Sequence, residues 1–106
     1  MAVPERLRLE EYRRLAIMRA RAAVSALALL GVRACVTGSL ARGRFGIHSD
    51  IDFLVTSCPR SLKYAIEGIV EEALEGMPFE VIYLDEIPAW KVARFTEGAV
   101  DASELR

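Results

Sequence analysis

The sequence has little of what disulfide scaffolds and zinc sites require. It contains two cysteines, Cys35 and Cys58, and one histidine. The two cysteines form neither a CxxC pair nor a zinc-binding pattern. We therefore interpret both as buried or half-buried thiols of a protein in a reducing cytoplasm.

Long hydrophobic runs and an excess of one charge are absent too. No apolar run approaches the roughly 18 residues of a membrane span, and the opening "MAVPERLRLEEYRR" lacks the apolar region of a secretory signal. The 14 basic and 15 acidic residues give a net charge of −1. Without an apolar run of this length, we expect no membrane association. Because the charges are balanced, the chain has no general affinity for a phosphate backbone, and we expect no stable DNA binding.

What the sequence does have is enough apolar material for one core. Hydrophobic residues make up 53% of the 106 residues and charged residues 27%, which is typical of a globular protein. Domains of this size are common. We expect residues 1–106 to form a single domain.

Periodicity and turn residues predict the order of the elements. Helix-period apolar positions, Pro4 near the start and Gly31 at the end indicate a first helix, and a short helix is expected after Gly38. A third helix is expected over Ser61–Glu75, with Ser61 as its N-cap, and a fourth after Pro88, followed by a fraying tail. The strands are expected over Val32–Thr37, Ile51–Val55 and Phe79–Leu84. The pattern favours an α/β (α+β) fold, with a small mixed sheet of three to four strands covered by helices.

Two aspartates stand at the start of the second predicted strand, Asp50 just before it and Asp52 within it. Asp50 and Asp52 are two residues apart, so their side chains project from the same face, roughly 6.6 Å apart along the backbone. Carboxylates this close repel each other, and a divalent cation removes the conflict. Oxygen ligands with room for water and phosphate suit Mg²⁺. The alternative is an edge strand with acids facing solvent.

A glycine–serine pair lies ten residues upstream, after the first predicted strand. Gly38 lets a phosphate approach the backbone, and the Ser39 hydroxyl can donate a hydrogen bond to it. Arg42 and Arg44 add positive charge to the same loop. Taken alone, Ser39 fits a helix N-cap equally well, and the arginines fit a solvated surface. Next to two metal-binding aspartates, the set predicts a nucleotide–metal site.

A third acid, Glu80, stands among apolar residues of the third predicted strand. Transfer chemistry with two metal ions needs a further ligand, and often a base near the attacking hydroxyl. Glu80 is the candidate for this role. The alternative is a polar residue on the edge of the sheet.

The stretch "GSLARGRFGIHSDIDFLV" resembles the G-S-x-A-R-G…S-D-x-D signature of nucleotidyltransferases with the DNA polymerase β palm. The short chain is similar to the minimal nucleotidyltransferases of bacteria and archaea. The resemblance implies that Gly38 and Ser39 hold the β- and γ-phosphates of ATP and that Arg42 supports the phosphate loop. It also implies Mg²⁺, with two ions expected, on Asp50 and Asp52.

Glu80 matches the family's third carboxylate, which is usually an aspartate. The resemblance implies that this acid helps to bind metal or to activate the nucleophile. A longer side chain could still reach the ion, or it could leave a site that binds nucleotide and transfers poorly.

Minimal members of the family commonly act as antitoxins paired with a HEPN-domain toxin, and some transfer AMP to tyrosines of that toxin. The resemblance therefore implies transfer of AMP from ATP to a hydroxyl of a HEPN-type partner. Two alternatives stay open: an antitoxin that acts by binding alone with a vestigial site, and nucleotidyl transfer to a small molecule or an RNA end. A homodimer or hetero-oligomer is also expected, since covering an edge would stabilise a sheet this small. Trp90 and Phe95 are expected to pack on the sheet or on a partner.

Overall fold

The computed structural model describes residues 5–106, and Pro4, the predicted start of the first helix, lies outside this range. The order of elements is the one predicted from the sequence. The helices and strands are α1 (Glu5–Leu29), β1 (Arg33–Thr37), α2 (Gly38–Ala41), β2 (Ile51–Ser57), α3 (Ile66–Leu74), β3 (Phe79–Tyr83) and α4 (Val92–Thr96). Short 3₁₀ turns cover Arg60–Ala65, Leu84–Glu86, Ala89–Lys91 and Ala102–Glu104.

The three strands form one mixed sheet in the order β1-β2-β3. β1 runs antiparallel to β2, and β2 runs parallel to β3. A single antiparallel bridge between Val36 and Val100 extends the sheet at the outer side of β1. The α+β class and the small mixed sheet expected from the sequence are thus confirmed.

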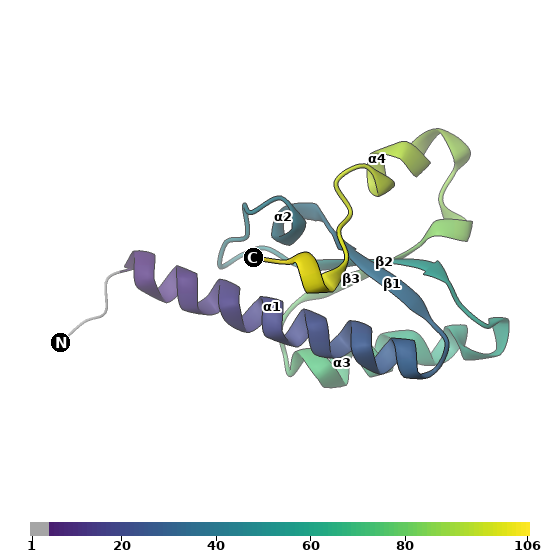
Figure 1. Cartoon of the computed structure of the whole chain (residues 1–106), viewed down its shortest axis with the longest axis horizontal. Helices are drawn as coiled ribbons and strands as arrows, with labels where there is room; N and C mark the ends of the chain where they lie inside the picture. The colour runs from purple at the N-terminus through teal and green to yellow at the C-terminus, as the bar shows by residue number, and fades with distance from the viewer. Residues whose placement is uncertain (1–4) are drawn as a thin grey trace.

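The hydrophobic core lies between the sheet and helices α1 and α3, which cover the same face of the sheet (Figure 1). Every second residue of β2, namely Ile51, Phe53 and Val55, is buried in this core, as the alternation of a strand requires. Burying a side chain of this size contributes roughly 1.5–3 kcal/mol. Small residues of α1, such as Ala16 and Ala20, are fully buried, so the helix can pack closely on the sheet.

The opposite face of the sheet holds Asp52 and Leu54, which alternate with these core residues. Figure 1 shows α4 on this side of the sheet, away from α1 and α3. The Thr37 hydroxyl at the end of β1 donates a hydrogen bond of 3.2 Å to the backbone carbonyl of Phe95 in α4. This bond ties α4 to the sheet. Trp90, one turn earlier, has a relative exposure of 77% and does not pack on the sheet.

The helix predicted over Ser61–Glu75 is only partly correct. Residues Arg60–Ala65 form a 3₁₀ turn before α3, and Ser61 lies inside this turn and does not cap a helix. The reason lies at Pro59, whose carbonyl accepts the Leu62 N–H at 3.0 Å and so starts an i to i+3 pattern.

The fraying tail expected after α4 is wrong. Arg21 of α1 donates hydrogen bonds to the carbonyl oxygens of Ala102 (3.0 Å) and Leu105 (2.7 Å). The side chains of Ala102 and Leu105 are each 3% exposed and belong to the core. The C-terminal segment therefore packs along α1, as Figure 1 also shows.

None of the helices in residues 5–106 combines the length and the apolar character that a membrane span requires.

Candidate functional site

The predicted acids meet on the sheet face that α1 and α3 leave open. Asp52 on β2 and Glu80 on β3 are direct partners in the parallel register. Their backbones are therefore roughly 4.8 Å apart, and their side chains project from the same face. Asp50 immediately precedes β2 and is exposed. The structure thus brings carboxylates from two strands and one loop into one neighbourhood.

The electrostatics of Asp52 reflect this neighbourhood. Partial burial, followed by the negative charges of Glu80 and then Asp50, raises the pKa of Asp52 from 3.8 to about 6. Without a cation, the ionised carboxylate is therefore disfavoured by its surroundings. A divalent ion would remove both causes, because it replaces the missing hydration and neutralises the repulsion.

Gly38 begins α2 directly against Asp52. Its φ is +72°, a backbone conformation that favours glycine. A Cβ atom at this position would lie 3.1 Å from Cγ of Asp52 and would overlap its Oδ2 atom. Thr37, the residue before it, is also the register partner of Asp52. The glycine–serine turn and the first strand acid are thus in contact, and only glycine fits between them.

The rest of the predicted phosphate loop forms a short, tight turn. The Arg42 N–H donates to the Gly38 carbonyl at 3.1 Å, and the Arg44 N–H donates to the Ser39 carbonyl at 2.9 Å. Ser39 is half-buried, and Arg42 is exposed with its Nε atom 3.7 Å from the place of a Cβ on Gly98. Arg42 is therefore positioned between α2 and the turn that follows α4.

The donor atoms of the acids decide whether the site suits a metal ion. Within the described residues, no three acidic, histidine or cysteine side chains form a ready-made metal-binding group. The available donors, Asp50, Asp52 and Glu80, are hard carboxylate oxygens of the type that Mg²⁺ prefers. Two of the three side chains are exposed and free to reorient. The donor set fits a divalent ion, with Asp52 as the partly buried member.

Two further residues support the site: Thr37, which the sequence did not indicate, and Ser49, which belongs to the S-D-x-D signature but was given no role of its own. Thr37 is 5% exposed and links the site to α4 through its bond to Phe95. The Ser49 hydroxyl accepts a hydrogen bond of 2.9 Å from the Gly46 N–H, which closes the turn just before Asp50. A serine three residues after a glycine is a local signal that could have identified the second of these turns.

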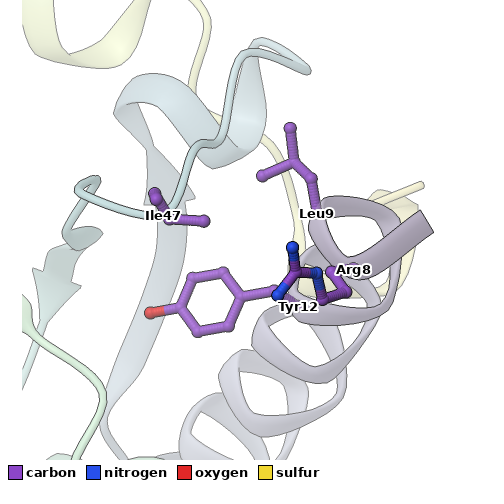
Figure 2. Close-up of a pocket in the computed structure, with 4 residues that line it drawn as sticks. All are labelled: Arg8, Leu9, Tyr12 and Ile47. Atoms are coloured by element: carbon purple, nitrogen blue, oxygen red, sulfur yellow. The ribbon is translucent and has the colours of Figure 1, made fainter. Parts of the chain in front are cut away.

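A cavity of about 380 Å³ lies elsewhere, between the N-terminal half of α1 and the loop before Asp50. Figure 2 shows Arg8, Leu9 and Tyr12 projecting from the helix and Ile47 projecting from the loop. The Tyr12 ring also stacks on Phe45, with ring centroids 5.6 Å apart, and so fixes the loop on α1. None of the predicted site residues lines this cavity, so we do not include it in the site.

Comparison with protein families gives one match. The family model described as "Nucleotidyltransferase domain" matches residues 17–100, which is well over half of the chain and includes all the predicted site residues. Comparison with curated proteins and with solved structures gives no significant match.

Proposed function

This chain belongs to the nucleotidyltransferase domain family, and we propose that it transfers AMP from ATP to a hydroxyl group of a partner protein. One observation supports the site most strongly. The Asp52 carboxylate lies against the Gly38 turn on one side and beside Glu80 on the other. A group bound at the turn would therefore lie within reach of both acids.

In the proposed reaction, Gly38 and Ser39 bind the β- and γ-phosphates, and Arg42 supports their loop. Asp50, Asp52 and Glu80 would hold Mg²⁺, which when bound supplies positive charge to the α-phosphate and the leaving pyrophosphate. The acceptor oxygen forms a bond to the α-phosphorus, while the bond to pyrophosphate breaks. The hydroxyl proton passes to the exposed Glu80 carboxylate, which therefore acts as the base.

We further propose that the acceptor is a tyrosine of a HEPN-type toxin, so that the chain acts as an antitoxin. This proposal is supported by the stretch "GSLARGRFGIHSDIDFLV", which resembles the signature of minimal nucleotidyltransferases. A second candidate is an antitoxin that acts by binding alone. It is favoured by Glu80, which stands where the family usually has an aspartate.

The test uses ATP labelled at the α- or the γ-phosphate, Mg²⁺, and a HEPN-type toxin as acceptor. Adenylyl transfer predicts labelled toxin from α-labelled ATP alone, and loss of the label in Asp50→Asn and Asp52→Asn. Glu72→Gln is the matched control, because Glu72 is an exposed carboxylate on α3, outside the site. Transfer that survives in both aspartate variants would refute the proposal. Neutralisation of the toxin without label would support binding alone.

A further inference from the structure

Strand β3 has an open outer edge. It lies at the end of the sheet and pairs only with β2 among the described residues. At the other end of the sheet, the bridge between Val36 and Val100 covers part of β1. The outward backbone N–H and C=O groups of Phe79–Tyr83 are therefore available to an added strand.

A groove of about 280 Å³ follows this edge. Its lining includes four consecutive residues of β3, from Glu80 to Tyr83. Neighbouring residues of a strand point to opposite faces, so a groove on one face would be lined by every second residue. Four in succession mean that the groove runs along the exposed backbone of the edge. The rest of its lining comes from the segment after β3, namely Glu86, Ile87, Pro88, Lys91 and Phe95.

The groove begins at the proposed site. Glu80 lines it and is also the register partner of Asp52. The four residues of β3 that line it span roughly 13 Å, the length of an extended segment of similar size. A chain lying along β3 would pass directly beside the proposed base.

The charges of the groove distinguish between acceptor classes. Glu80 and Glu86 line it together with Lys91, and Glu86 also forms an ion pair of 3.2 Å with Lys63. Asp52, the register partner of Glu80, and Asp50, which immediately precedes β2, add negative charge at its near end. A nucleic-acid backbone would be repelled here, because its binding depends on several cations near its phosphates. A peptide backbone has no such requirement.

We propose that an extended segment of the acceptor protein adds to β3 as a further strand of the sheet and thereby places its hydroxyl group beside Glu80. This inference rests on the proposed function and specifies how the acceptor binds. Backbone hydrogen bonds to the edge provide affinity for many acceptor sequences, as in other cases of strand addition. The reaction is the one given above: the hydroxyl oxygen bonds to the α-phosphorus of ATP, pyrophosphate leaves with the bonding electrons, and Glu80 takes the proton.

The experiment uses a library of nonapeptides with one central tyrosine and flanking residues drawn from Ala, Val, Ile and Lys. Two further libraries are N-methylated at alternate flanking residues, one at the odd and one at the even positions. In an added strand, only alternate N–H groups point to β3. We expect one methylated library to lose at least about ten-fold in labelling from α-labelled ATP, the effect of about two lost hydrogen bonds, and the other to change little.

A protein variant tests the same surface from the other side. Ile87→Glu places a third acid in the far part of the groove, away from the proposed metal ligands, and should reduce peptide labelling several-fold. Ile47→Glu is the matched control, because Ile47 is an exposed isoleucine that lines the separate cavity near α1. It should label the peptides as the unchanged protein does.

The outcomes separate this inference from the proposed function. Equal labelling of all three libraries, equal loss in both methylated ones, or labelling of an RNA end in place of peptides would overturn strand addition. Metal-dependent conversion of ATP to AMP and pyrophosphate with no peptide labelled would overturn it too, while the transfer chemistry stands. Absence of any metal-dependent attack on ATP, by water or by any acceptor, would instead refute the proposed function itself.

Discussion

Replacing Asp52 by asparagine should stabilise the metal-free protein, although the change removes a proposed metal ligand. Burial and the neighbouring charges of Glu80 and Asp50 raise the pKa of Asp52 from 3.8 to about 6. At neutral pH the folded protein therefore holds an ionised carboxylate in surroundings that favour the neutral form. Asparagine has nearly the same shape and no charge, so it mimics the protonated acid.

The size of the effect follows from the shift. A pKa change of about two units corresponds to at most about 3 kcal/mol in the free energy of unfolding. Asp52 is only partly buried, so solvent screening reduces this to about 1–2 kcal/mol. For a domain of this size the Tm should rise by about 5–10 °C.

The direction of the pKa shift determines how the stability difference between Asp52→Asn and the unchanged protein varies with pH. Because the folded pKa of Asp52 lies above the unfolded value, the stabilising contribution of its protonated form is fully present below about 3.8 and is lost as the pH rises through about 6. The variant should therefore exceed the unchanged protein in stability at about pH 8 and match it near pH 4.

The assay is thermal unfolding in EDTA at both pH values. Asp50→Asn is the control, because Asp50 is exposed and is the last of the three causes of the shift at Asp52; its effect should be smaller. Adding Mg²⁺ should stabilise the unchanged protein and leave Asp52→Asn nearly unaffected. An Asp52→Asn protein that folds but is no more stable at pH 8 in EDTA would refute this account of the acidic cluster.

Three further changes test the contacts that build the site and the fold. Gly38→Ala should destabilise the protein by more than about 1 kcal/mol and impair ATP binding, because alanine is strained at this φ and its Cβ overlaps the Asp52 carboxylate. In denaturant titrations, Gly43→Ala should show the strain alone, since Gly43 has the same φ of +72° and nothing within 4 Å of an added Cβ. Arg21→Ala removes hydrogen bonds to three carbonyl oxygens of the C-terminal segment and should lower the free energy of unfolding by about 1.5–3 kcal/mol. Amide exchange over residues 99–105 should become faster, and unchanged exchange there would contradict the packing described for this segment. Thr37→Val should lower the free energy of unfolding by about 1 kcal/mol and speed amide exchange in α4, to which the Thr37 hydroxyl is bonded; an unchanged α4 would show that this bond does not hold it.

The order of the elements could be predicted because its signals are local. The short apolar run Ile51–Val55 indicates a strand, Gly31 indicates the end of the first helix, and Gly38 indicates the end of the strand that follows it. The position of the acids on that strand determines which face they share. Each of these inferences depends on residues that are close in sequence, so no knowledge of the packing is needed.

The features that could not be predicted depend on contacts between distant residues. The C-terminal segment is held by hydrogen bonds from Arg21, about 80 positions earlier in the chain. No local pattern around Ala102 predicts such a partner. The role of Thr37 likewise depends on the carbonyl of Phe95, which reaches it only after α4 has crossed the sheet. The sequence around Ser61 resembles a helix start, but the turn at Pro59 decides the local geometry.

The mixed pairing of the sheet is what brings the site together. β1 ends at Thr37, and because it runs antiparallel to β2, its end meets the beginning of β2 at Asp52. β3 runs parallel to β2, so its beginning, with Glu80, meets the same point. With an antiparallel β3, Glu80 would lie at the far end of β2, several residues from Asp52. The same topology leaves β3 at the edge of the sheet, so the arrangement that concentrates the negative charge also leaves a free strand beside it. The proposed base and the proposed docking edge therefore lie on one strand because of how these three strands pair.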